Sequence, residues 1–170
     1  MNFAAMQEEH GAWIKENFPE QPLWHSLLGI CEEVGEAAHA VLKMSQAELY
    51  GQEPRYKDRD WMAELADAVG DIMIYLTGAF SNVWFSVAKL VVTVKTSTSE
   101  ISSDTVYIGA LSHWVGEALF FSNLTFDCAL NIVRWCKMLC IIHGLDFDAA
   151  VETTWKKVQL RRRNEKAQPG

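Results

Sequence analysis

CEEVGEAAHA at residues 31–40 and ELADAVGD at residues 64–71 decide the fold of this 170-residue chain. In both stretches, small and apolar residues recur every three or four positions, which is the spacing of one face of a helix. Small residues on that face let two helices approach closely. The two stretches therefore predict two consecutive helices that pack against each other.

Both predicted helices also carry acids that share a face. These acids are Glu32, Glu33 and Glu36 in the first stretch, and Glu64, Asp67 and Asp71 in the second. Like charges at helical spacing destabilise an isolated helix, so helix formation alone does not account for them. A bound cation would reverse that effect, and ligands that are all oxygens suit Mg²⁺ or Mn²⁺. The alternative is that the acids form the solvated faces of two amphipathic helices.

The rest of the chain also has helical periodicity, and no segment alternates as a strand does. We predict an all-α helical bundle in which the two acidic helices are antiparallel and hold the metal site between them. Asp60 and Asp146 are expected N-caps, and Gly144 is an expected helix end. The predicted helices span residues 4–17, 24–44, 60 to about 92 with a kink near Gly78 or Ser81, 105–121, 127–143 and 147–163, with a polar loop at 51–58.

Length and charge limit the classes of function. A chain of 170 residues suits one domain, 1–170, with a Ser/Thr-rich connection at 93–104. The net charge of −7 argues against binding to a nucleic acid polymer or an anionic membrane. The four cysteines form no CxxC pair and the first residues do not resemble a signal peptide, so we expect a cytoplasmic protein.

The stretch at residues 72–88 contains no charge but is short for a membrane span. We interpret it as a buried or interfacial helix. Its apolar surface, with Phe80, Trp84 and Phe85, is more than a small monomer would be expected to cover, which predicts contacts between copies of the chain.

The order EExxE, 27 further residues, then ExxD resembles the MazG-like all-α nucleoside triphosphate pyrophosphohydrolases. The resemblance covers about residues 10–76 and 147–163, including Trp13, the FP turn at Phe18 and the basic end WKKVQLRRR. It implies hydrolysis of a (d)NTP between the α- and β-phosphates with Mg²⁺ or Mn²⁺, and assembly as a homodimer or homotetramer. The chain is also similar to phage proteins of this family that act on dGTP, so a purine nucleotide is one candidate substrate.

Carried over by the resemblance, the expected metal ligands are Glu33, Glu36, Glu64 and Asp67. Glu32 is either a further ligand or a group that orients the attacking water, so the expected catalytic acids are Glu32, Glu33 and Glu36. The expected substrate contacts are Lys43, Lys156 and Arg161 at phosphate, Trp13 and His25 at the base, and Asp71 at the metal or the base. Related sequences commonly have asparagine where this chain has Leu160, which weakens the expected phosphate contact.

Three other functions stay open. A phosphoribosyl-ATP pyrophosphohydrolase would share the acidic site and differ in substrate. Glu36 and His39 form one Glu-x-x-His motif, which di-iron carboxylate bundles use twice, whereas this chain contains it once. A non-catalytic helical protein that binds nucleotides would keep the acids without turnover.

Overall fold

The computed structural model describes residues 1–50, 59–80, 86–96, 103–121 and 123–166, with side chains up to residue 163. The described residues form helices and no strand, which confirms the all-α prediction. The helices are α1 (Phe3–Asn17), α2 (Leu23–Tyr50), α3 (Trp61–Ala79), α4 (Val87–Thr93), α5 (Asp104–Phe120), α6 (Phe126–Ile142) and α7 (Phe147–Lys166).

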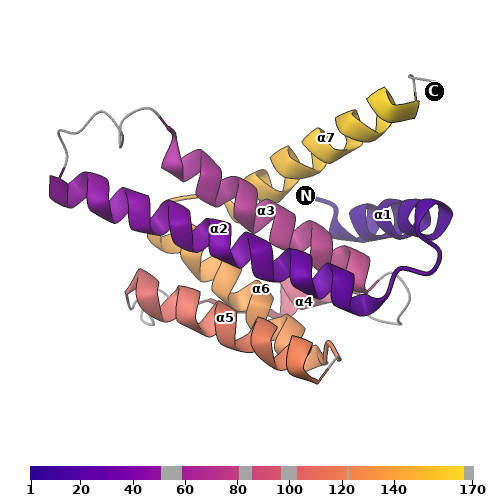
Figure 1. Cartoon of the computed structure of the whole chain (residues 1–170), viewed down its shortest axis with the longest axis horizontal. Coiled ribbons are helices and arrows are strands. Elements are labelled where there is room, and N and C mark those ends of the chain that lie inside the picture. The colour runs from indigo at the N-terminus through magenta and orange to yellow at the C-terminus, as the bar shows by residue number, and fades with distance from the viewer. Residues whose placement is uncertain (51–58, 81–85, 97–102, 122, 167–170) are drawn as a thin grey trace.

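Helix α3 is the centre of the arrangement, because it contacts α1, α2, α6 and α7. It runs antiparallel to α2, as predicted, with α5 and α6 on one side of this pair and α1 and α7 on the other (Figure 1). Ile72, Met73 and Leu76 of α3 are fully buried, so the helix that carries the second acidic stretch is also the core helix. The second acidic stretch therefore lies on a helix that is packed into the core.

Three predicted helix ends are confirmed. The side chain of Asp60 accepts a hydrogen bond from the backbone N–H of Ala63 (3.0 Å) and caps α3. Asp146 accepts from Ala149 N–H (2.9 Å) at the start of α7. Gly144 has φ of +67°, a conformation that glycine adopts without strain, just after α6 ends.

The predicted helix from residue 60 to about 92 is wrong, because α3 ends at Ala79 and α4 begins separately at Val87. Ser86 caps the new helix by accepting from Lys89 N–H. The side chain of Gln7 joins the two ends: its Nε2 donates to Phe80 O (3.3 Å) and its Oε1 accepts from Val87 N–H (2.8 Å). A contact from α1 thus satisfies backbone groups that the break in the helix exposes.

The apolar stretch at 72–88 is covered by this chain where the structure describes it, since Phe80 is buried with the α3 core. Trp84 and Phe85 lie outside the described residues, so their predicted role between copies stays a prediction. The predicted loop at 51–58 and part of the connection at 93–104 also lie outside them. Helix α2 reaches Tyr50, six residues beyond its predicted end.

Within the described part of the chain, no single helix is long and apolar enough to cross a membrane. Helix α6 and residues 147–163 of α7 pass that test only as a pair, and the pair is bent by 108°.

Candidate functional site

The acids of α2 and α3 meet at the edge of the α2–α3 interface. Val34, Ala37, Leu65 and Ala68 are buried beside them, and this close packing of small and apolar side chains draws the carboxylates together. Glu33 is the most enclosed, at 9% exposed. Its pKa is raised to about 8, first by burial and then by the charges of Asp71, Glu36, Glu32 and Asp67. No described residue forms a hydrogen bond or ion pair with Glu33.

Asp71 continues the acidic cluster along α3. Its pKa is raised to about 6, mainly by burial and by Asp67, while Arg161 and Lys157 of α7 act in the opposite direction. Asp71 therefore lies close enough to Asp67, Glu36 and Glu33 to interact with their charges, as predicted. It thus lies within the electrostatic influence of both the acidic cluster and the basic face of α7.

Asp67 is held by α7. Thr154 Oγ1 and Lys157 Nζ each donate to Asp67 Oδ1 over 2.9 Å. Lys156, one of the three predicted phosphate contacts, has a side chain that is 67% exposed and pairs with Glu152 (2.6 Å). The sequence contained a signal for the difference, because Thr154, Lys157 and Arg161 are three and four residues apart and share a helix face that Lys156 does not.

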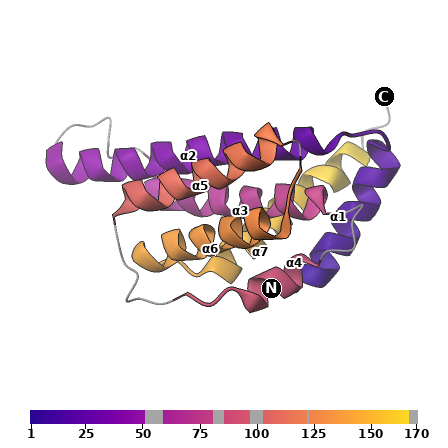
Figure 2. The same ribbon diagram turned by 90° about the horizontal axis from the view of Figure 1, so that it is seen from below.

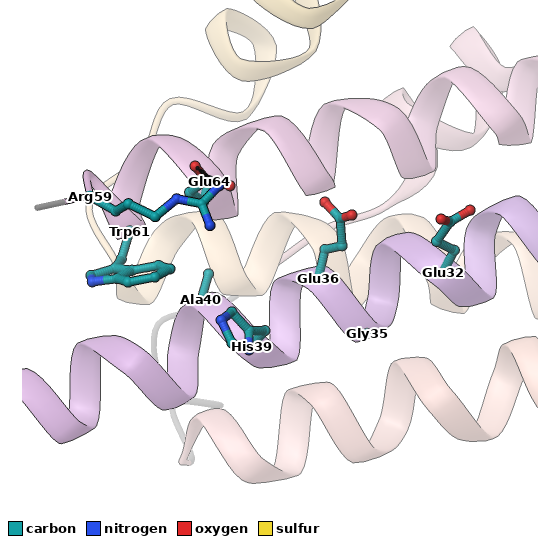
Figure 3. Close-up of a pocket in the computed structure, with 8 residues that line it drawn as sticks. All are labelled: Glu32, Gly35, Glu36, His39, Ala40, Arg59, Trp61 and Glu64. Atoms are coloured by element: carbon teal, nitrogen blue, oxygen red, sulfur yellow. Dashed lines mark ion pairs between the residues drawn. The ribbon is translucent and has the colours of Figure 1, made fainter. Parts of the chain in front are cut away.

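A pocket of about 350 Å³ opens between α2 and the start of α3 (Figure 3). Glu32 and Glu36 point into the same space, and Glu64 lies at the end nearer Trp61. There Glu64 forms an ion pair with Arg59 (3.0 Å), and the Arg59 guanidinium lies 5.4 Å from the centre of the Trp61 ring. The structure thus places Glu64 in one pocket with Glu36. The carboxylate of Glu64 is, however, paired with Arg59, a residue that the sequence analysis did not identify.

A second pocket, of about 410 Å³, lies between α1, α3 and α7. Asp71 and Arg161 line it together with Trp13, Phe18 and Tyr75. The position of Trp13 is fixed, because the Arg162 guanidinium lies 4.0 Å from its ring centre and the Phe18 ring packs edge-on at 5.2 Å. Aromatic rings and charged groups therefore share one cavity next to the acidic cluster.

The inner end of this second pocket contains a neutral histidine. Burial, and then the charge of Arg162, lowers the pKa of His10 to about 4. Thr77 Oγ1 donates its hydrogen to Ile74 O (2.7 Å), and His10 Nδ1 lies 3.0 Å from the same Oγ1. The hydroxyl hydrogen is already used, so His10 Nδ1 is the donor in that contact. The other ring nitrogen, Nε2, is left as an acceptor.

Two predicted substrate contacts are not brought to these pockets by this chain. His25 is exposed and packs edge-on against Trp24, with ring centres 4.0 Å apart. Lys43 lies further along α2 and donates to Gln46 Oε1 (3.1 Å). Neither residue lines either pocket.

The described residues contain no group of three or more Asp, Glu, His or Cys side chains that is arranged to hold a metal ion. The donor set nevertheless fits Mg²⁺ or Mn²⁺ in its chemistry. It consists of carboxylates from two adjacent helices, and one of them, Glu33, is buried among four other acids without a cation among the described residues. A divalent cation would stabilise the ionised form of Glu33 that burial disfavours.

No protein-family model, no curated protein and no solved structure matches this chain.

Proposed function

We propose that this chain is a metal-dependent hydrolase that cleaves a nucleoside triphosphate between its α- and β-phosphates, releasing the monophosphate and pyrophosphate. The observation that carries the proposal is the position of Asp71. It belongs to the acidic cluster around Glu33, and it also lines the aromatic pocket with Arg161. A nucleotide has the matching arrangement, because a planar base lies at one end and a polyanion that binds divalent cations lies at the other.

The acidic cluster would hold the cation through Glu33, Glu36, Asp67 and Asp71. Bound Mg²⁺ or Mn²⁺ neutralises phosphate charge and lowers the pKa of a coordinated water. Glu32 points into the same pocket as Glu36 and is the acid best placed to take a proton from an attacking water. Glu64 would join the ligands only after leaving Arg59.

Helix α7 would bind the phosphates. Lys157 and Arg161 lie on the face of α7 that meets Asp67 and Asp71, and both lower the pKa of Asp71 by their charge. A positive group next to the metal ligands stabilises charge that develops on the leaving pyrophosphate. Leu160, which stands where related sequences commonly have asparagine, is exposed on α7 and lines neither pocket. Leucine at this position therefore does not prevent Arg161 from lining the second pocket.

The aromatic pocket would bind the base. The Trp13 ring has a cation on one side and an aromatic edge beside it, so its position is set before a ligand arrives. Stacking on such a ring gives affinity for any base. A cytoplasmic location would supply this substrate.

The test is to incubate the purified chain with each common NTP and dNTP in ¹⁸O-labelled water, with Mg²⁺ or Mn²⁺, and to identify the products by mass spectrometry. Monophosphate plus pyrophosphate is expected, with the label in the monophosphate if water attacks the α-phosphorus. Glu36→Gln should remove activity, and Glu48→Gln, an exposed acid of α2 outside both pockets, should keep it.

Diphosphate plus orthophosphate would show a different bond cleavage and reject the proposed reaction. Full activity of Glu36→Gln would reject the site. Absence of turnover with all nucleotides, in a preparation whose thermal midpoint rises with Mg²⁺, would favour a binding function instead.

A further inference from the structure

Arg59 is the cationic residue of the first pocket. Its side chain is 60% exposed, yet the guanidinium points into the pocket and lies 3.0 Å from the carboxylate of Glu64 (Figure 3). Among the described residues that line this pocket, Arg59 alone has a permanent positive charge. An ion pair between two exposed side chains adds little to stability. Folding therefore gives little reason for an arginine at this place.

The guanidinium rests on an aromatic platform. It lies 5.4 Å from the centre of the Trp61 ring, and the same ring packs edge-on against His39 of α2 with ring centres 5.7 Å apart. Trp61 is 9% exposed, so the platform is fixed between α2 and α3. A planar guanidinium can stack on a ring and still donate hydrogen bonds from its edge. Arg59 can therefore change its hydrogen-bond acceptor while it stays beside the pocket.

The two pockets lie at different levels along the α2–α3 pair. These helices run along each other in both views (Figure 1 and Figure 2). At the level of the first pocket, His39 packs against Trp61. At the level of the second, the Tyr75 ring lies so close to Gly29 that an added Cβ would approach it to 2.4 Å. Trp61 and Tyr75 are 14 residues apart in α3, which is about 21 Å along the helix axis.

A row of acids joins the two levels. Glu64 lines the first pocket, Asp71 lines the second, and Asp67 lies between them on α3. The row from Glu64 to Asp71 is about 10 Å long. The pKa of Asp71 is raised mainly by burial, and Glu36 of the first pocket adds to that rise by its charge, so the two ends of the row interact. A chain of phosphates that starts at the second pocket and follows this row ends at Arg59.

We propose that Arg59 binds the terminal phosphate of the substrate and so selects a nucleoside triphosphate over a diphosphate. This inference rests on the proposed function, which places the base in the second pocket and the metal ligands along the row of acids. The guanidinium suits the task, because it donates two parallel hydrogen bonds to phosphate oxygens. Until the metal site is filled, Glu64 holds Arg59. A carboxylate that has become a metal ligand attracts a guanidinium less, so Arg59 is then free to bind phosphate.

The basic residues then divide the phosphate chain between them. Arg161 and Lys157 of α7 act on Asp71 by their charge, at the end of the row next to the base. Arg59 comes from the segment before α3 and acts at the far end. A diphosphate bound by the same base and the same α7 contacts would end before Arg59. The guanidinium would then keep Glu64 as its partner.

Titration calorimetry with Mn²⁺ alone tests the competition for Glu64 and needs no nucleotide. Arg59→Gln should bind Mn²⁺ about two- to fivefold more tightly than wild type, because no guanidinium then opposes the metal at Glu64. In the Glu64→Gln background, Arg59→Gln should leave the Mn²⁺ affinity nearly unchanged. Lys89→Gln is the matched control, because it removes one positive charge from an exposed side chain of α4 outside both pockets. Equal or weaker Mn²⁺ binding by Arg59→Gln would overturn the proposal.

Analogues that resist cleavage test the selection by phosphate number. The probes are the α,β-methylene analogues of ATP and ADP, added to protein saturated with Mn²⁺. Arg59→Gln should lose affinity for the triphosphate analogue roughly 10- to 100-fold, because it loses hydrogen bonds from a charged group, and should change affinity for the diphosphate analogue less than about twofold. Circular dichroism should show an unchanged fold, as expected at an exposed position. Equal losses for the two analogues, or no loss, would contradict the assignment of Arg59.

Inorganic pyrophosphate separates a failure of this inference from a failure of the proposed function, because it has no base. With Mn²⁺, wild type should bind it at least about tenfold more tightly than Arg59→Gln. That result without hydrolysis of any nucleotide would keep Arg59 as a phosphate-binding residue and reject the reaction. Release of monophosphate and pyrophosphate, with ligand affinities that do not depend on Arg59, would keep the reaction and overturn this inference. A wild type that binds neither pyrophosphate nor the analogues would overturn both.

Discussion

Lys157 Nζ lies 2.9 Å from Asp67 Oδ1, and this ion pair joins the basic face of α7 to the acidic face of α3. Thr154 donates to the same oxygen from one turn earlier on α7. Both side chains of the ion pair are partly exposed, so the pair contributes little to folding, at most about 1 kcal/mol. Its position beside Asp71 gives it a role in the proposed site instead.

Replacing Lys157 by Met should lower kcat/KM for the nucleotide roughly 10- to 100-fold, since a hydrogen bond from a charged group is worth about 1.5–3 kcal/mol. The adjacent Lys156→Met is the matched control and should change kcat/KM less than about twofold, because Lys156 pairs with Glu152 away from the acids. Pyrophosphate release measures both. Equal losses in the two variants would contradict the assignment of Lys157.

Glu33→Gln should remove a pH dependence of stability. The pKa of Glu33 is raised to about 8 in the folded chain, so the folded state binds more protons than the unfolded state between about pH 4.5 and 8. The free energy of unfolding of the metal-free wild type should therefore fall as pH rises through this range. Mg²⁺ should restore stability at pH 8 in wild type but not in Glu33→Gln.

Urea unfolding at a series of pH values between 6.5 and 8 measures this dependence of the free energy of unfolding on pH. The pKa of Asp71 is about 6, and His10, with a pKa of about 4 in the folded chain, titrates near 6.5 when unfolded, so both groups contribute at the lower end of this pH range. Both groups are present in wild type and in Glu33→Gln, so the difference in stability between the two proteins isolates the contribution of Glu33. Because the pKa of His10 is lowered, its effect has the opposite sign and appears as stability lost when pH falls below about 6.5. A difference in stability between wild type and Glu33→Gln that stays constant from pH 6.5 to 8 would reject the burial of Glu33.

Trp13→Ala should raise KM at least about tenfold with little change in kcat, because base stacking on an aromatic ring contributes about 1–3 kcal/mol. Steady-state kinetics with the preferred nucleotide measures this. Trp24→Ala is the control: Trp24 is exposed and contacts His25 outside both pockets, so its KM should be that of wild type. A larger effect at Trp24 would place the base elsewhere.

Gly70→Ala should destabilise the fold by about 1–3 kcal/mol, because its methyl would overlap the Thr154 side chain where α3 and α7 meet. Thr154→Gly removes every Thr154 side-chain atom that the methyl would meet, including Cβ at 2.6 Å, so adding Gly70→Ala to it should carry a much smaller penalty. Chemical denaturation of the four proteins in the cycle gives the coupling. Additive effects would show that the two helices are not in contact there.

The sequence by itself predicted the local features of this chain. Apolar periodicity located the acidic helices, and the cap at Asp60 and the glycine at Gly144 marked helix ends that the structure confirms. These features depend on residues within about one helical turn of each other, so they can be read directly from the sequence. The sequence predicted a kink near Gly78 or Ser81 but not two separate helices, because the contact that joins their ends comes from Gln7, about 80 residues away.

The acidic residue types of the candidate site were also readable from the sequence, and helical spacing groups Lys157 with Arg161 on one face of α7, but the sequence did not show which face of α7 meets α3. Lys156 and Lys157 are chemically identical, and only the rotation of α7 against α3 decides that Lys157 reaches Asp67. The tertiary structure likewise buries Glu33, forms an ion pair between Glu64 and Arg59, and brings Trp13 and Arg161 into one pocket. Local patterns fix which faces are apolar or acidic, whereas packing between distant helices fixes which atoms meet.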